Sequence, residues 1–210
     1  MNETALYQAL TRYGDVYELD IKSDVRLLNT QLEQFKNDWK IYNPRKNIRR
    51  EGLSITSLDG GLSGIPDLDS VVEYNRKNNT SLGEQDFNVK TPVYPYVSNW
   101  LDVFEQDLGR THLIRLNPGG FFPIHRDNTT IGIKTFRLFI PISNCNYPIM
   151  TFLLNRRLLT FNHGSVYFMD TCLEHLVFNA GMDIDVTFIV ANVRLTSRSV
   201  NTVLRNLMAR

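Results

Sequence analysis

Apolar residues in the first hundred positions recur at a helical spacing. Steps of three or four residues separate Val25, Leu28, Leu32, Phe35 and Trp39. Side chains at this spacing share one face of a helix and Ser23 is a suitable N-cap, so we predict an amphipathic helix over about residues 24–39. Related patterns predict helices over about 66–78 and 98–108. Glycines interrupt residues 52–65, where we expect a loop or a short strand.

After Gly109 the pattern changes to short apolar runs separated by turn residues. Runs rich in Ile, Leu, Phe, Val and Thr predict strands near 111–116, 120–125, 133–142, 149–154, 157–161, 165–169, 174–179 and 184–194. Short strands in this number favour a mostly β fold with flanking helices, namely a double-stranded β-helix, the jelly roll that cupins also adopt. The apolar residues after Ser197 predict a short closing helix.

The chain has 210 residues, a length that fits one domain with an elaborated flank. We expect residues 1–109 to form a helical and loop region that covers the barrel and its substrate side. Residues 110–196 form the predicted double-stranded β-helix core, and residues 197–210 the C-terminal helix. The first region has no other evident surface to pack against than the barrel.

Charge and composition argue against several classes of protein. Lys and Arg total 23 against 22 for Asp and Glu, so no positive field favours nucleic-acid binding. No apolar run approaches the ~20 residues that span a bilayer. The N-terminus lacks a basic segment followed by an apolar stretch, so we expect a cytoplasmic location without a secretory signal. Cys145 and Cys172 lack the spacing of zinc or redox sites and are expected to be small buried residues.

The placement of two histidines and one aspartate indicates a metal site. His125 and Asp127 lie two residues apart at the end of a predicted strand, so both side chains leave the same face. His175 begins a later strand. Two imidazoles and one carboxylate are typical of non-haem Fe(II) oxygenases, in which other coordination positions stay open. Zinc hydrolysis with the same ligands is chemically possible. We assign no metal role to His112 or His163.

Three segments carry a resemblance to a known family. They are Leu116-Asn-Pro-Gly-Gly-Phe-Phe-Pro-Ile-His125-Arg-Asp127, Phe136-Arg137-Leu-Phe-Ile-Pro-Ile142 and Gly164-Ser-Val-Tyr-Phe-Met-Asp170-Thr-Cys-Leu-Glu-His175-Leu-Val-Phe-Asn179. Together they resemble the aspartyl/asparaginyl β-hydroxylase branch of the Fe(II)/2-oxoglutarate-dependent oxygenases, over about residues 110–194.

This resemblance implies a double-stranded β-helix with Fe(II) held by His125, Asp127 and His175. It also implies 2-oxoglutarate as co-substrate, molecular oxygen as oxidant, and release of succinate and CO2. The expected reaction is hydroxylation of an unactivated C–H bond in an amino acid, a peptide side chain or a small metabolite.

The resemblance places Arg137 against the bound 2-oxoglutarate. A guanidinium on an otherwise apolar strand needs an anionic partner, and a carboxylate suits its planar fork. A structural salt bridge to a nearby Asp or Glu is the alternative.

One position departs from the family pattern. The family has a second arginine about ten residues after the distal histidine, where this chain has Asp185. A shifted register, another cation such as Arg115 or Arg137, or a different organic co-substrate would each account for the difference. Thr187 is expected to face the same side as Asp185 and could donate a hydrogen bond.

Other residues are candidates for supporting roles. Asp170 or Glu174 could orient an imidazole of the metal site, or simply occupy a solvated turn. The basic segment from Asn43 to Ser54 could hold an acidic substrate or the far carboxylate of the co-substrate, or form a solvated loop. Two other functions stay open: a cupin-type metal-dependent dioxygenase or isomerase without an oxo acid, and a non-catalytic jelly-roll binding module.

Overall fold

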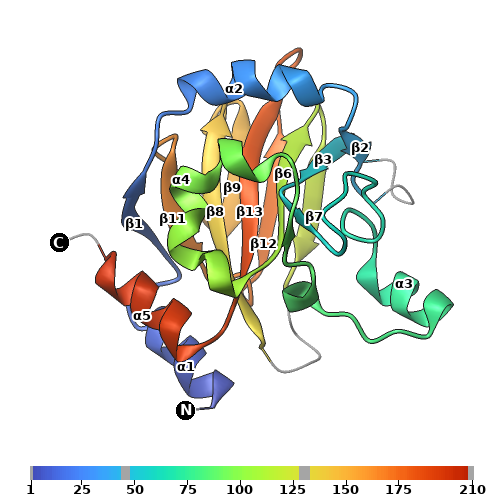
Figure 1. The fold of residues 1–210 in the computed structure, drawn as a ribbon. Coiled ribbons are helices and arrows are strands. Elements are labelled where there is room, and N and C mark those ends of the chain that lie inside the picture. The colour runs from blue at the N-terminus through green and yellow to red at the C-terminus, as the bar shows by residue number, and fades with distance from the viewer. Residues whose placement is uncertain (1, 44–47, 128–132, 208–210) are drawn as a thin grey trace.

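The framework of the computed structural model, which describes residues 2–43, 48–127 and 133–207, is a pair of antiparallel sheets that face each other. The larger sheet has seven strands in the order β1-β11-β8-β13-β6-β3-β2, and the smaller has four in the order β10-β9-β12-β7. The protein is therefore mostly β with flanking helices, and its core is the predicted double-stranded β-helix (Figure 1).

All eight strands predicted after Gly109 are present. Their bounds are β6 Leu108–Leu116, β7 Phe121–His125, β8 Thr135–Ser143, β9 Met150–Leu154, β10 Arg157–Leu158, β11 Ser165–Met169, β12 His175–Asn179 and β13 Val186–Arg194. Successive strands alternate between the two sheets in chain order except for β9 and β10, which form a hairpin within the smaller sheet.

The expectation that residues 1–109 contain only helices, loops and at most one short strand is wrong. Three strands from this region extend the larger sheet: β1 Val16–Lys22, β2 Lys40–Ile41 and β3 Arg50–Ser54. In β1 the buried Leu19 and Ile21 alternate with exposed Asp20 and Lys22, which is the period of a half-buried strand. A separate two-stranded sheet pairs β4 Thr56–Ser57 with β5 Val89–Lys90. The division of the chain at residues 109 and 196 stays a prediction.

The helices of the first hundred residues are shorter than their patterns predict. The helix expected over 24–39 is α2 Arg26–Leu32, which tightens into a 3-10 turn, η1 Glu33–Phe35. The helix expected over 66–78 begins later, as α3 Val71–Asn78, where the Ser70 hydroxyl accepts a hydrogen bond from the Glu73 amide. The helix expected over 98–108 is α4 Ser98–Leu101, followed by a 3-10 helix, η4 Asp102–Asp107. The remaining elements are α1 Glu3–Thr11, η2 Glu84–Asp86, η3 Tyr94–Tyr96 and the predicted closing helix, α5 Ser197–Arg205.

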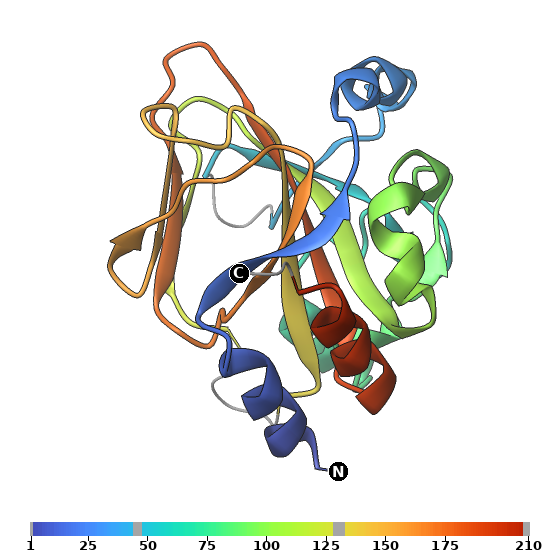
Figure 2. The ribbon, with the colours of Figure 1, turned by 90° about the vertical axis from the view of Figure 1, so that its left-hand side faces the viewer.

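Two apolar clusters fill the molecule. The first lies between the outer face of the larger sheet and the helices, where Leu10, Trp100 and Val203 pack against strand residues such as Ile189. Helices α1, α4 and α5 therefore cover one side of the sandwich, and the smaller sheet lies on the other side (Figure 2). The second cluster lies between the two sheets and is rich in phenylalanine: Phe139, Phe152, Phe161 and Phe188.

Two further expectations concern the cysteines and membranes. Cys145 is buried and Cys172 half-buried, and both are free thiols. Among the described residues, no helix is both long and apolar enough to cross a membrane. A cytoplasmic location stays a prediction.

Candidate metal centre

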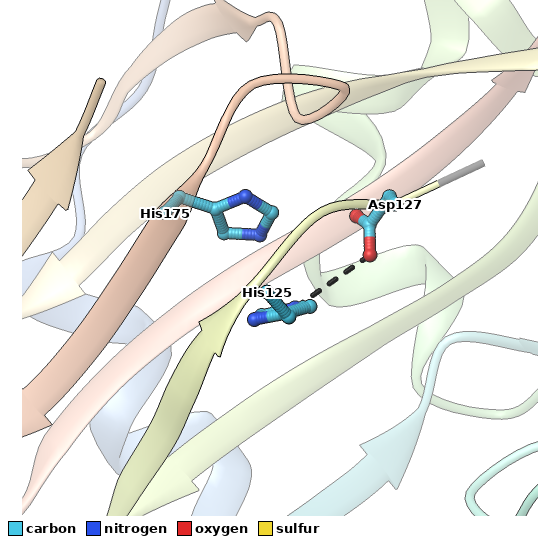
Figure 3. A group of neighbouring side chains, drawn as sticks. All are labelled: His125, Asp127 and His175. Atoms are coloured by element: carbon cyan, nitrogen blue, oxygen red, sulfur yellow. Dashed lines mark ion pairs between the residues drawn. The ribbon is translucent and has the colours of Figure 1, made fainter. Parts of the chain in front are cut away.

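Strand pairing brings the two histidines together. Strands β7 and β12 are antiparallel neighbours, and their register places His175 opposite His125. The two imidazole centroids are 4.1 Å apart. Asp127 follows β7 by two residues, and its amide donates a 2.8 Å hydrogen bond to the Thr171 carbonyl. One ligand atom from each of His125, Asp127 and His175 lies within 4.8 Å of the others, and the three side chains converge in Figure 3.

Backbone carbonyls orient both imidazoles. His125 Nδ1 lies 2.7 Å from the Pro123 carbonyl oxygen, and His175 Nδ1 lies 2.9 Å from that of Leu173. A carbonyl can only accept, so each Nδ1 carries the proton and each Nε2 keeps a free lone pair. Burial lowers the pKa of His175, which favours its neutral, metal-binding form. The donor set of two imidazole nitrogens and one carboxylate therefore fits a divalent transition metal.

Arg137 lies beside the carboxylate of this triad. Its Nε is 2.8 Å from Oδ2 of Asp127. Burial by itself would raise the pKa of Asp127, but the charge of Arg137, the neighbouring imidazoles and a hydrogen bond from Thr171 outweigh it and hold that pKa below its usual value. The alternative of a salt bridge from Arg137 to an acidic side chain is thus realised in this structure. This contact is an ion pair: the buried Nε of Arg137 has no hydrogen-bond partner among the described residues, and the side chain lines the adjoining pocket.

The triad opens into a pocket between the two sheets. Its polar lining groups gather at the metal end: His125, Asp127, Arg137, Thr171 and His175. The rest of the lining, apart from Tyr42, is apolar and consists of Phe122, Leu138, Phe139, Phe152, Met169, Val177, Phe188 and Val190. Arg137 is the only arginine or lysine among the described residues that line this pocket.

Three residues considered for the far carboxylate lie elsewhere. Arg115 pairs with Glu51 at 3.4 Å, and its guanidinium carbon is 3.9 Å from the centroid of the Trp39 ring. Asp185 accepts a 3.3 Å hydrogen bond from Asn117 and, with Arg115 and Thr187, lines a second groove beside α2. Asp185 therefore does not line the pocket beside the triad, to which β13 presents Phe188 and Val190 instead.

Asp170 and Glu174 do not orient the imidazoles, because both Nδ1 atoms bond to carbonyls. Asp170 instead braces the turn before β12. Its Oδ1 accepts a 2.7 Å hydrogen bond from the Tyr7 hydroxyl and a 3.2 Å one from the Cys172 amide. Sequence reasoning missed Tyr7, since it lies 163 residues from its partner and no local pattern links them.

The basic segment reaches the neighbourhood of the pocket through one residue. Arg50, on β3, is buried, and its guanidinium carbon lies 4.0 Å from the Phe122 centroid and 5.0 Å from that of Tyr42. Burial lowers the pKa of Arg50 to about 10. Arg49 donates to the Pro118 carbonyl, and the prediction for residues 44–47 of this basic segment lies outside the described residues.

The other two histidines have no place in the triad. His163 Nε2 accepts a 3.1 Å hydrogen bond from the Cys145 amide, which is consistent with the absence of an assigned metal role. His112, on β6, is 2% exposed and packs against Tyr42 with ring centroids 5.2 Å apart.

Comparison with known proteins gives only distant structural similarity. No family model and no curated protein matches the sequence. A prolyl-4-hydroxylase from Pseudomonas putida aligns at a TM-score of 0.49 and 12% identity, over 92% of this chain and 98% of that chain. An oxidoreductase of the 2OG-Fe(II) oxygenase family from Burkholderia pseudomallei aligns at 0.49 and 11%, over 93% and 91%. A collagen prolyl hydroxylase of Paramecium bursaria Chlorella virus-1, solved with 2OG, aligns at 0.45 and 8%, over 90% and 99%.

Proposed function

We propose that this protein is a mononuclear non-haem Fe(II) oxygenase that uses a 2-oxo acid as co-substrate. The observation that carries the proposal is the triad of His125, Asp127 and His175, whose ligand atoms lie within 4.8 Å of one another and whose Nδ1 atoms both bond to backbone carbonyls, which leaves each Nε2 free to bind a metal. Three protein ligands on one side leave the opposite coordination positions for the oxo acid and dioxygen.

The residues around the triad have distinct tasks in this proposal. The three ligands would hold Fe(II), which supplies the electrons and open positions that dioxygen activation requires. Arg137 would bind the carboxylate of the oxo acid that lies next to the metal, because its guanidinium already faces that end of the pocket. The apolar walls would exclude water from the reacting groups.

The proposed reaction is a hydroxylation. One oxygen atom of O2 ends in the carboxylate that remains after the oxo acid loses CO2, and the other ends in the hydroxyl group of the product. The sequence resemblance names 2-oxoglutarate, with succinate as its product, and an amino acid, peptide side chain or small metabolite as substrate. Membership of the aspartyl/asparaginyl β-hydroxylase branch stays a prediction.

A second candidate is a cupin-type metal enzyme that needs no oxo acid. It is favoured by the contact between Arg137 and Asp127. Because this guanidinium already has an anionic partner inside the protein, it does not require the carboxylate of an oxo acid. A non-catalytic jelly-roll module remains the alternative without chemistry.

Turnover separates these candidates. With Fe(II) and a panel of 2-oxo acids, we expect CO2 release from the oxo acid coupled to O2 uptake, both lost in His125→Ala. The matched control is His163→Ala, outside the triad, which should keep the activity. Metal binding without oxo-acid decarboxylation would favour the cupin-type enzyme. Oxo-acid binding that is the same in His125→Ala as in the unaltered protein, and that needs no metal, would favour the binding module.

A further inference from the structure

Apart from Arg137, no lysine or arginine among the described residues lines the pocket, and the only uncharged hydroxyl groups there are those of Tyr42 and Thr171. From His175 an aromatic wall runs inward between the sheets. The rings of His175 and Phe152 are 6.5 Å apart, those of Phe152 and Phe139 are 5.3 Å apart, and those of Phe139 and Phe188 are 4.9 Å apart. Phe139, Phe152 and Phe188 are each at most 4% exposed. A side chain that enters the pocket beyond the metal therefore meets phenylalanine.

Strand register places Arg137 at the metal end of this wall. On β8, Arg137 lies opposite Asn192 of β13, and the next inward pair is Phe139 with Val190. The pair after that is Pro141 with Phe188. Because its Nε also contacts Asp127, Arg137 is placed to meet a carboxylate beside the metal and not one that lies two methylene groups deeper.

Among the described residues, no other arginine lines the pocket. Arg50 does not line the pocket, and its guanidinium packs on the Phe122 and Tyr42 rings, which do. Arg110 is held by the backbone carbonyls of Asp67 and Asp69 and by Glu84. A carboxylate buried against phenylalanine without a cation or hydrogen-bond donors is strongly unfavourable.

We infer that the pocket selects a 2-oxo monocarboxylic acid with an apolar side chain, and that it discriminates against the dicarboxylate 2-oxoglutarate. This inference rests on the proposed function. The 1-carboxylate would meet Arg137 and the metal end, while the apolar side chain would pack against Phe139, Phe152 and Phe188. Burial of methyl and methylene groups there is favourable, whereas burial of the terminal carboxylate is not.

A matched pair of ligands tests the inference on the unaltered protein. 2-Oxopentanoate has the carbon chain of 2-oxoglutarate, with a methyl group in place of the far carboxylate. The protein would be loaded with Fe(II) without oxygen and titrated with each acid, and with 4-methyl-2-oxopentanoate. Binding would be read from the visible charge-transfer absorption of the chelated oxo acid and from the shift in Tm. We expect both apolar acids to bind at least about tenfold more tightly than 2-oxoglutarate.

The outcomes are distinguishable. Tighter binding of 2-oxoglutarate than of 2-oxopentanoate would overturn the inference and leave the proposed function standing. In that case the Arg50→Met variant tests whether Arg50 binds the far carboxylate. If it does, the variant should lose the preference for 2-oxoglutarate over 2-oxopentanoate. Fe(II) binding without charge-transfer absorption for any oxo acid would overturn the proposed function together with the inference.

A pair of variants tests the wall itself. Phe188→Ala should weaken binding of 4-methyl-2-oxopentanoate by about tenfold, because the ligand loses apolar contact. Phe178→Ala is the matched control, since this side chain is 40% exposed and does not line the pocket. Equal affinities in Phe188→Ala, Phe178→Ala and the unaltered protein would contradict the assignment.

Discussion

At the residue scale, the tautomers of the two histidines are set by backbone atoms. Pro123 and Leu173 each lie two residues before the histidine whose Nδ1–H they accept, so the strand ends themselves orient the imidazoles. No distant side chain is needed to present the Nε2 lone pairs. Asp127 depends on its surroundings more, because Arg137 stabilises its ionised form.

Replacement of Arg137 separates its two possible roles. In Arg137→Gln, we expect affinity for the 2-oxo acid to fall roughly 30-fold, because a charge-assisted hydrogen bond contributes about 2 kcal/mol. Fe(II) binding should persist, since all three ligands remain. Calorimetric titrations of metal and then oxo acid measure the two steps separately. Unchanged oxo-acid affinity would assign Arg137 to the structure of the site alone.

His112 should make stability depend on pH. Burial lowers the pKa of His112 well below 6.5, and the positive charges of Arg110, Arg137 and Arg50 lower it further. Below pH 6.5 the unfolded chain binds a proton at this position that the folded protein does not. The resulting stability is complete above pH 6.5 and is lost as pH falls toward the folded-state pKa.

The variant His112→Asn removes this dependence. Between pH 7.5 and 5.5, the free energy of unfolding of the unaltered protein should fall by about 1.4 kcal/mol more than that of His112→Asn. Urea unfolding at the two pH values measures the difference. Equal losses in the two proteins would mean that His112 is protonated in the folded state.

At the element scale, the turn between β11 and β12 holds the metal ligands in place through hydrogen bonds. Asp170 receives the Tyr7 hydroxyl of α1, and its own amide donates to the Asp15 carbonyl at 2.7 Å. The same turn carries the Leu173 and Thr171 carbonyls that hold His175 and the Asp127 amide. The N-terminal helix thereby supports the metal ligands from outside the barrel.

Tyr7→Phe tests this support. Loss of the buried hydroxyl, which leaves Asp170 with one partner fewer, should lower the free energy of unfolding by about 1–3 kcal/mol. Metal affinity should fall as well, because the turn is less firmly held. Tyr147→Phe is the control, since Tyr147 is 67% exposed. If stability falls while metal affinity is unchanged, α1 supports the fold and not the site.

The elements also show what a sequence can predict. Strands after Gly109 were predictable because apolar runs and turn residues alternate there, and the triad was predictable because its members lie at strand ends. Strand β1 was missed, since only Leu19 and Ile21 carry its buried alternation. The far wall of the pocket was not predictable, because pairing across β8 and β13 decides which side chains line it.

At the scale of the whole molecule, the metal ligands connect parts of the chain that are far apart. His125 and His175 lie on neighbouring strands of the smaller sheet, and Asp127 is tied to the turn that α1 braces. A ligand that binds only the folded state stabilises it in proportion to the logarithm of its concentration over its Kd.

Metal loading should therefore raise global stability. At a free Fe(II) concentration about 100 times its Kd, the free energy of unfolding should rise by about 2.7 kcal/mol. Anaerobic urea unfolding with and without Fe(II), followed by addition of a chelator, measures the gain and its reversal. The Asp127→Ala variant should show little gain. An equal gain in this variant would place the metal elsewhere on the chain.

The most direct test of the metal centre is an anaerobic titration of the protein with Fe(II), followed by a 2-oxo acid, in parallel with the His175→Ala variant. We predict one equivalent of bound Fe(II) per chain and visible charge-transfer absorption when the oxo acid is added, both absent in the variant. Equal Fe(II) binding by the two proteins, or bound Fe(II) without absorption for any oxo acid, would contradict the proposed oxygenase.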